Sequence, residues 1–303
     1  MSDDTHVFDV ATVGNYTKDT IITKGGTLQA DGGGVTYSAH AAHTLGQDVA
    51  AVTRLAKEDF HVVRSLEEFG VTVFATATPS STLMRLEYPT DNPDQRILTV
   101  ADTAGSFTPE QVRTINARAF IISPSIRGEM PIETIRELRS KKSMISADAQ
   151  GFIRVRRPDG RLEHVAWPEQ GDVLELVDIL KADVVEAEAL TGETDMERAA
   201  RSLAAQGPRE VIITHGDGIF LLAQDRVFEA EFHAKSMLGR SGRGDTCVGS
   251  YVAARLDRPP EEALYWSAAT TSLKMEAPGP IRRPYEAIVE LLENTYKGVQ
   301  PTT

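Results

Sequence analysis

The sequence predicts an α/β fold in which a mostly parallel central sheet is flanked by helices. Short apolar runs such as Val7–Val13 alternate repeatedly with helical stretches such as 58–69. This repeated strand–helix–strand (βαβ) pattern favours parallel strands joined by helices that cover the sheet. Two strand-like runs between residues 81 and 100 break the rhythm, because only a polar, proline-containing turn joins them. The sequence therefore also predicts a small β-sheet insertion.

Composition bounds the organisation of the chain and its partners. At 303 residues, with no internal repeat and no Gly-, Ser- or Pro-rich linker, it is expected to form one domain over 1–303. A formal charge of -12 argues against nucleic acid or an anionic membrane as the main partner. No signal peptide and no run of about 18 apolar residues is evident. Cys247 is the only cysteine, so no intramolecular disulfide can form, and a cytoplasmic location is expected.

The first half of the chain supplies strands and helices in alternation. A buried strand at 7–13 ends at Gly14, and a turn over 14–19 leads to a second strand at 19–24. Three glycines, Gly32 to Gly34, precede an Ala-rich helix at 35–45 and let the backbone approach something closely or merely turn. The remaining expected elements are strands at 49–53 and 71–75, a helix at 58–69, and a hairpin of strands at 81–88 and 95–100.

The second half repeats the alternation. Strands are expected at 119–123, 143–148, 210–214, 219–223 and 226–232. Helices are expected at 131–139, 172–180, 196–206, 260–275 and 284–296. The segment 151–171 is polar and is expected to be a loop.

One stretch carries recognisable chemistry. Gly242 and Gly244 stand directly ahead of an apolar, helix-periodic segment, which places free backbone N–H groups at a helix N-terminus. Asp245 falls in the same first turn. N–H groups that hold an anion beside a carboxylate that accepts a proton are what phosphoryl transfer to a hydroxyl requires. A carboxylate that merely caps the helix is the alternative.

Ser241 to Asp245 resembles the C-terminal signature of the ribokinase-like (PfkB) carbohydrate kinases. The resemblance implies a three-layer α/β sandwich with a β-sheet lid built from about 19–30 and 81–101. It also implies that Gly242, Arg243 and Gly244 form an anion hole and that Asp245 is the catalytic base. Arg243 stands where the family's motif has Ala. The version of the motif with Arg resembles that of the inositol-kinase-like branch. Arg243 either adds positive charge near the phosphates or is a solvated side chain.

The resemblance also marks an acceptor side. Gly14 and Asp19 match the family's spacing between the end of the first strand and an Asp that holds substrate hydroxyls. Gly33 and Gly34 match its substrate-pocket glycine pair. Tyr37 stands where the family has an Asn, which makes ribose itself doubtful as the acceptor.

A donor side is implied by the second half of the chain. Asp183 and Glu186 match an Asn-x-x-Glu segment, so that Glu186 would help to hold Mg²⁺ through water, near the nucleotide phosphates. The structural alternative is two carboxylates that favour a helix start. Thr214 and Gly216 match the family's nucleotide-binding turn, which implies ATP as co-substrate.

The function expected from these features is a Mg²⁺-dependent, ATP-type kinase that phosphorylates a hydroxyl of a polyol or sugar, best matched by myo-inositol or a similar cyclitol. A nucleoside or furanose sugar kinase of the same family is the alternative within this class. A catalytically idle sugar- or nucleotide-binding sensor, and an enzyme that uses ADP as donor, are the others. Lid sheets of relatives can pair, so a homodimer through the lid is also expected, against a lid edge that stays single.

Overall fold

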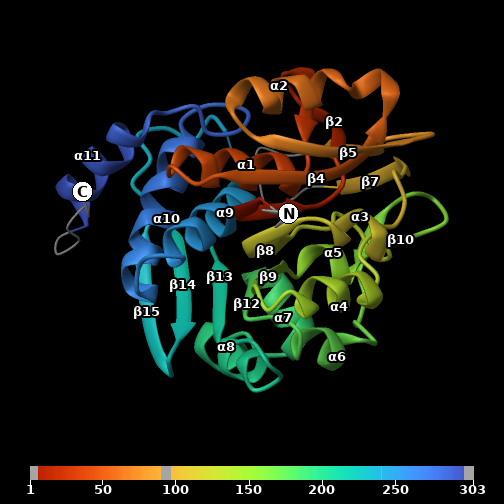
Figure 1. The fold of residues 1–303 in the computed structure, drawn as a ribbon. Helices are drawn as coiled ribbons and strands as arrows, with labels where there is room; N and C mark the ends of the chain where they lie inside the picture. The colour runs from red at the N-terminus through yellow and green to blue at the C-terminus, as the bar shows by residue number, and fades with distance from the viewer. Residues whose placement is uncertain (1–5, 90–96, 240, 297–303) are drawn as a thin grey trace, which may run out of the picture.

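A nine-stranded sheet forms the centre of the protein (Figure 1). A computed structural model describes residues 6–89, 97–239 and 241–296. In spatial order the strands are β15 (Arg226–Glu231), β14 (Gly218–Ala223), β13 (Glu210–Thr214), β12 (Ile179–Asp183), β9 (Met144–Asp148), β8 (Asn116–Ile122), β1 (Val7–Val13), β4 (Val49–Ala56) and β5 (Thr72–Thr78).

Seven neighbouring strands, from β13 to β5, run parallel, whereas β14 and β15 are antiparallel to their neighbours. The inner parallel strands are largely apolar and mostly buried, because helices cover both faces of the sheet, whereas the edge strand β5 has no buried residue. The mostly parallel sheet expected from the sequence is confirmed.

Two helical layers enclose the sheet, and each has its own apolar core. One layer contains α1 (Gly34–Thr44), α2 (His61–Phe69), α9 (Arg243–Arg255), α10 (Pro260–Met275) and α11 (Tyr285–Thr295). The other contains α3 (Pro109–Arg113), α4 (Ile132–Ser140), α5 (Gln150–Ile153), α6 (Gln170–Leu174), α7 (Val184–Thr191) and α8 (Met196–Ala204). In the part of the chain that the structure describes, no helix is long and apolar enough to cross a bilayer.

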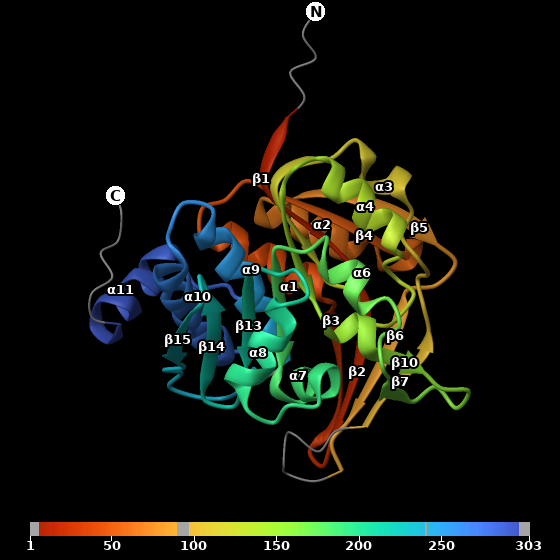
Figure 2. The same ribbon diagram turned by 90° about the horizontal axis from the view of Figure 1, so that it is seen from below.

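A separate four-stranded sheet forms the lid (Figure 2). Its order is β3 (Gly26–Gly32), β2 (Thr17–Thr23), β6 (Thr82–Glu87) and β7 (Ile97–Asp102). The two strand segments expected at 19–30 and 81–101 therefore do form one small sheet, although residues 90–96 lie outside the described ranges. Asp19 lies within strand β2, whereas the sequence suggested that it would end the preceding turn.

Two expectations for the middle of the chain are wrong. The helix expected at 172–180 is shorter, because α6 ends at Leu174 and Ile179 already begins β12. The run from Ile179 to Ala182 is fully buried between β9 and β13, so strand pairing overrides its helix-compatible pattern. The expected loop at 151–171 contains most of α5 and the hairpin of β10 (Arg154–Arg156) and β11 (Leu162–His164).

The order of the strands also fixes where a ligand can bind. From β1 the chain proceeds outward to β4 and β5, and then returns to β8 on the opposite side of β1. The reversal makes the carboxyl ends of β1 and β8 a topological switch point, where open α/β sheets bind ligands. Gly14 follows β1 and Ser123 follows β8, so both lie at this switch point.

Candidate active site

Residues from distant parts of the sequence meet at the carboxyl edge of the main sheet. The first turn of α9 lies over this edge, with helix α1 packed beside it. Asp148, Asp183 and Thr214 end β9, β12 and β13 at the same edge. Gly34 begins α1 close to Asp245, because a Cβ on Gly34 would lie 2.6 Å from Asp245 Oδ1. The structure therefore brings the substrate-side glycines and the expected base together.

The turn before α9 has the geometry of an anion site. Gly242 is the N-cap residue with φ 75°, in the left-handed region that glycine adopts at little cost. The helix begins at Arg243, so the amides of its first turn have no carbonyl partner within the helix. A Cβ on Gly242 would lie 2.2 Å from the Tyr37 ring, so the ring lies directly against the turn. Tyr37 thus supports the anion hole, and its predicted contact with the acceptor stays a prediction.

Lys274 of α10 holds the chain that enters this turn. Its Nζ donates hydrogen bonds to the carbonyl oxygens of Gly239, at 2.5 Å, and of Ser241. Gly239 also contacts the opposite loop so closely that a Cβ there would lie 1.7 Å from the Ala277 carbonyl oxygen. Glycine at this position is therefore required by backbone packing. Burial lowers the pKa of Lys274 to about 8, although Asp245 opposes the shift.

Asp245 lies between groups of opposite character. Its Oδ1 atom is buried and has no hydrogen-bond partner among the residues that the structure describes. Burial raises the pKa of the Asp245 carboxyl above its usual range, and the nearby Lys181 and Arg154 oppose that rise. A general base works best when its pKa approaches the working pH, so this shift suits the role that the sequence assigns to Asp245.

Buried polar atoms that lack partners lie on β2 and just after β1 and β8, and two of their residues, Asp19 and Ser123, lie near Asp245. Asn15 Oδ1, Asp19 Oδ1 and Ser123 Oγ are all buried and make no hydrogen bond within the described residues. Ser123 Oγ would lie 3.2 Å from a Cβ on Gly34, on the same side of α1 as the Asp245 carboxylate. Buried polar groups are nearly always paired in folded proteins. Several unpaired ones at the switch point of the sheet indicate a ligand that carries many hydrogen-bonding groups.

The glycine run packs closely against this group of polar residues. A Cβ on Gly32 would lie 2.3 Å from Asp19 Oδ2, and one on Gly33, where φ is 94°, would lie 2.6 Å from the Asn15 carbonyl oxygen. The close backbone approach expected of these glycines is confirmed. Burial raises the pKa of Asp19 to about 6, a hydrogen bond with Thr17 opposes that rise, and the negative charge of Asp245 adds to it.

The other side of Asp245 is lined by cations. Lys181 on β12 lies with its Nζ 3.1 Å from Asp148 Oδ2 and 3.7 Å from Glu186 Oε2. Arg154 lies with one guanidinium nitrogen 3.2 Å from Glu186 Oε1. All four side chains are almost fully buried. With Lys274 on α10, they form a donor-side cluster around the start of α9, defined here as Asp148, Arg154, Lys181, Glu186 and Lys274.

These contacts bear on the prediction that Glu186 helps to hold Mg²⁺. Both of its carboxylate oxygens already face cations, and Glu186 Oε2 accepts a hydrogen bond from the Asp183 backbone N–H in a capping box of α7. Among the described residues, no group of three or more His, Cys, Asp or Glu side chains is arranged to hold a metal ion. Mg²⁺ prefers carboxylates that are free to coordinate it, so these residues do not fit a metal held by the protein itself.

The remaining donor-side predictions fall at the same edge of the sheet. Asp183 and Thr214 are register partners on β12 and β13. Thr214 is buried, whereas Gly216 lies in the β13–β14 hairpin, where a Cβ would meet nothing within 4 Å. Arg243 begins α9 with its guanidinium 5.9 Å from the centre of the Phe232 ring, and its charge lowers the pKa of Lys274. Binding of a nucleotide by Asp183, Thr214 and Gly216 stays a prediction.

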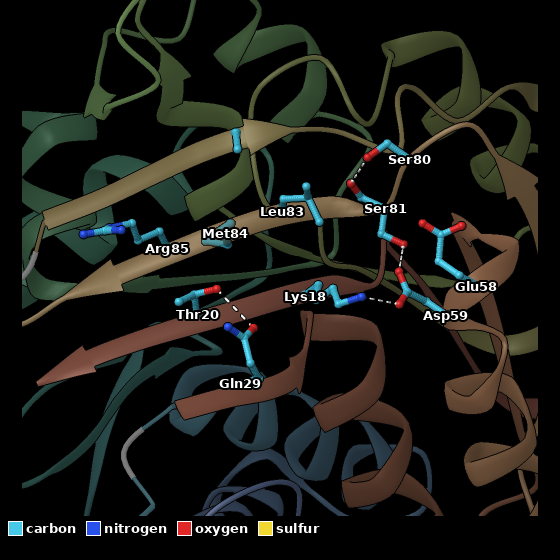
Figure 3. A pocket seen from close by; sticks show the side chains of 11 residues that line it. Lys18, Thr20, Gln29, Glu58, Asp59, Ser80, Ser81, Leu83, Met84 and Arg85 are labelled. Carbon is cyan, nitrogen blue, oxygen red and sulfur yellow. Dashed lines mark hydrogen bonds and ion pairs between the residues drawn. The ribbon is translucent and has the colours of Figure 1, made fainter. Parts of the chain in front are cut away.

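A cavity of about 460 Å³ lies elsewhere, on the lid (Figure 3). Lys18 and Thr20 line it, and they flank Asp19 on β2, so they point to the opposite face of the lid from Asp19. Asp59 at its end accepts hydrogen bonds from Lys18 Nζ at 2.8 Å and from Ser81 Oγ at 2.6 Å. This network ties β2 and the start of β6 to the short helix Lys57–Asp59. The cavity therefore lies on the lid face that points away from Asp245.

Sequence reasoning missed several residues that the structure brings to the site: Asn15, Ser123, Asp148, Arg154, Lys181 and Lys274. Asn15 and Ser123 had a usable signal, since each lies within two residues of the end of a buried strand. Lys181 had one too, because a lysine within an apolar strand requires a buried partner. Lys274 lies 29 positions beyond Asp245 on a different helix, and no local pattern marks it.

Comparisons with known proteins agree with this geometry. The model of the pfkB family carbohydrate kinases matches residues 7–287. No curated protein sequence matches the chain. The fold alone is shared with a ribokinase of Arabidopsis thaliana solved with ribose and ATP, which is 18% identical, with a TM-score of 0.76 over 95% of this chain and 99% of that one.

Two more similar solved structures are pyrophosphate-dependent kinases. A pyrophosphate-dependent kinase of the ribokinase family, solved with a pyrophosphate analogue and myo-inositol, is 31% identical, with a TM-score of 0.86 over 93% of this chain and 99% of that one. A pyrophosphate-dependent myo-inositol-1 kinase converted into a myo-inositol-3 kinase is also 31% identical, with a TM-score of 0.85 over 95% and 99%. The chain thus belongs to the pfkB family of carbohydrate kinases and is a phosphotransferase that acts on a hydroxyl group of a sugar or polyol.

Proposed function

We propose that the protein transfers the terminal phosphoryl group of inorganic pyrophosphate to one hydroxyl of myo-inositol or a closely related cyclitol. The observation that carries this proposal is the position of Asp245, between a pocket of unpaired buried polar atoms and a cluster rich in buried cations. The first suits a ligand made almost entirely of hydroxyl groups. The second suits a donor made almost entirely of phosphate.

The acceptor is argued from hydrogen-bonding capacity. A cyclitol presents a hydroxyl on every ring carbon, and each hydroxyl can donate one hydrogen bond and accept two. Asp19 and Asn15 offer acceptor oxygens without partners, and the Ser123 hydroxyl can both donate and accept. An analogue that lacks a hydroxyl would leave one of these buried groups unpaired, which is a strong source of discrimination. Of the similar structures named above, one was solved with myo-inositol and another is a myo-inositol kinase, which supports the same acceptor.

The donor is argued from charge. Pyrophosphate has no base or sugar to bind, so its affinity depends on cations and backbone amides. Lys181, Arg154 and Lys274 surround the first turn of α9, and Arg243 begins it. The pyrophosphate dependence of the relatives at 31% identity points the same way. We therefore favour pyrophosphate over ATP, the donor first expected from the sequence.

The transfer uses this chain's own groups in the following way. The acceptor hydroxyl lies beside Asp245, with neighbouring hydroxyls held by Asp19 and Ser123. A bond forms between the acceptor oxygen and the terminal phosphorus as the bond to the bridging oxygen breaks, and orthophosphate leaves. The hydroxyl proton passes to Asp245, while the amides of the turn from Gly242 to Gly244 neutralise charge on the phosphoryl oxygens. Asp245 later returns its proton to solvent.

A matrix of initial rates tests the proposal. Pyrophosphate, ATP and ADP are each combined with myo-inositol, ribose, fructose and adenosine, and the phosphorylated acceptor is measured directly. We expect the highest rate for pyrophosphate with myo-inositol. A higher rate with ATP would overturn the donor, and a higher rate with adenosine or a furanose would overturn the acceptor. Binding of both ligands without turnover would indicate an idle sensor.

A further inference from the structure

We propose that Lys181 is a catalytic residue whose ammonium group contacts the transferring phosphoryl group, in the place where a protein-held divalent ion would otherwise act. The inference rests on the proposed function and adds a named cation to it. Sequence reasoning assigned the neighbouring Glu186 to a metal and gave Lys181 no role.

The first observation is the position of Lys181 relative to the turn before α9. Its Nζ would lie 2.7 Å from a Cβ on Gly244, so the ammonium lies directly against the turn whose amides form the anion hole. Any side chain at position 244 would occupy the space between the ammonium and the turn. The glycine therefore serves a close approach between a cation and the backbone that receives the phosphoryl group.

The second observation is the pair of carboxylates that surround Lys181. The ammonium lies 3.1 Å from Asp148 Oδ2 and 3.7 Å from Glu186 Oε2, and its side chain is only 5% exposed. Two carboxylates that converge on one point are an arrangement that commonly holds a cation. Here the cation is part of the chain. Asp148 and Glu186 fix the ammonium group on one side. The ammonium is therefore preorganised to contact an anion on the side where Gly244 and Asp245 lie.

Arg154 supplies an independent observation. Its side chain is 10% exposed and is paired with Glu186 through one terminal nitrogen. Its Nε is buried and has no hydrogen-bond partner among the residues that the structure describes. An unpaired guanidinium N–H in the same cluster indicates that an anionic group completes the site. Lys181 and Arg154 together would supply two positive charges to an incoming phosphate.

The role proposed for Lys181 adds no proton transfer to the reaction. Lys181 keeps its proton throughout, because its carboxylate partners hold its pKa well above the usual lysine range against the effect of burial. It therefore acts only as a fixed positive charge on a phosphoryl oxygen. Asp245 remains the group that takes the acceptor proton, and the leaving phosphate departs from the opposite side of the transferring phosphorus.

The first test compares Lys181→Met, which keeps the length of the side chain and removes its charge, with Arg255→Met. Arg255 is paired with the buried Glu210 at 2.9 Å, at the far end of α9, so its variant also breaks an ion pair with a buried carboxylate. We expect Lys181→Met to lower kcat at least 100-fold with the KM for the acceptor within threefold, and Arg255→Met to change kcat less than twofold. A kcat within threefold of wild type in Lys181→Met would overturn the inference.

Two further arms separate a catalytic role from a structural one. Lys181→Ala leaves space for a small amine, so we expect methylammonium to restore turnover at least tenfold in a saturable way. A loss of turnover that methylammonium does not restore, accompanied by a matching rise in the KM for the acceptor, would assign Lys181 a structural role. The double variant Lys181→Met with Asp148→Asn removes the carboxylate left without a cation. It should fold if the single variant does not, and should show the same loss of kcat.

Binding of methylenediphosphonate, a pyrophosphate analogue with a non-hydrolysable bridge, is measured by calorimetry and is independent of turnover. We expect at least tenfold weaker binding to Lys181→Met than to wild type, and unchanged binding to Arg255→Met. Absent turnover in wild type would contradict the proposed function alone. Equal binding of the analogue by wild type and Lys181→Met would contradict the role of Lys181 alone.

Discussion

The two sides of Asp245 differ in how their charges are paired. On the acceptor side, Asp19 is buried with one oxygen unpaired, and the nearby charge of Asp245 raises its pKa further. On the donor side, the carboxylates of Asp148 and Glu186 are buried just as deeply, but each faces Lys181 or Arg154. The same residue types are thus left unsatisfied on one side and neutralised on the other.

This difference explains how one site can distinguish its two ligands. An uncharged polyol can satisfy the unpaired oxygens of the acceptor side with its hydroxyl protons. A phosphate placed there would face the negative charges of Asp19 and Asp245. The donor side has the opposite preference, because its cations and helix N-terminus favour an anion. In the proposed function, charge pairing would therefore separate the binding places of the two ligands.

The largest effect is expected where the two sides meet. Asp245→Asn keeps the shape of the side chain but cannot accept a proton, so we predict a loss of kcat of roughly 10²–10⁴-fold. Donor and acceptor affinities, measured by calorimetry, should change little. A variant with more than one tenth of the wild-type kcat would show that Asp245 is not the base.

The next largest effect is expected at the anion hole. Gly242→Ala places a Cβ 2.2 Å from the Tyr37 ring at a φ of 75°, so the turn must shift away from the phosphoryl group. We predict a loss of kcat of about 10²-fold, typical of displaced anion-hole donors. Gly279→Ala is the matched control, because φ is 80° and a Cβ would meet nothing within 4 Å. Equal kcat losses in both variants would reduce the effect to backbone strain.

A smaller effect, dependent on pH, is expected on the acceptor side. The pKa of Asp19 is raised to about 6, so the carboxylate that accepts hydroxyl protons is lost as the pH falls below that value. We predict that the Kd for the acceptor rises as the pH falls from 7 to 5. In Asp19→Asn the Kd should be raised at every pH, by about 10-fold or more, and should not vary over this range.

Asp59 offers the control for that titration. It is a buried carboxylate on the opposite face of the lid, and although burial raises its pKa, hydrogen bonds from Lys18 and Ser81 outweigh that effect and lower it. Asp59→Asn should therefore keep the wild-type pH dependence of acceptor binding. A pH-independent Kd in the wild-type protein would contradict the role given to Asp19.

The smallest effect is expected at Cys247, two residues after the base. The thiol is fully buried, and burial raises its pKa to about 11, so little thiolate exists at neutral pH. We predict that iodoacetamide at pH 7.5 leaves activity within 10% of its starting value over an hour. Rapid inactivation in parallel with modification of Cys247, followed by mass spectrometry, would show that the first turn of α9 opens.

The sequence predicted those features that local patterns encode. The buried strand Val7–Val13 and the helix Pro260–Met275 match their expected bounds, because their apolar patterns agree with their burial. Gly242, Gly244 and Asp245 were recognisable because an anion site at a helix N-terminus is built from consecutive residues. The hairpin of the lid was recognisable because no helix interrupts it.

Local sequence patterns could not predict the donor-side cluster. Lys181 and Asp148 come from strands that are neighbours only in the folded sheet, and Lys274 reaches the turn from another helix. The strand that carries Lys181 was itself partly assigned to a helix, because a short apolar run does not distinguish the two structures. The ion pair of Glu186 with Arg154 was missed for the same reason, since Arg154 lies 32 positions away in the sequence.

The most direct test of the account is a ³¹P NMR time course of the wild-type protein with pyrophosphate and myo-inositol. We predict that one phosphomonoester doublet, coupled to the ring proton of a single carbon, grows together with one equivalent of orthophosphate. Consumption of pyrophosphate to two equivalents of orthophosphate, with no phosphomonoester, would mean that water and not a polyol lies beside Asp245, and would contradict the account.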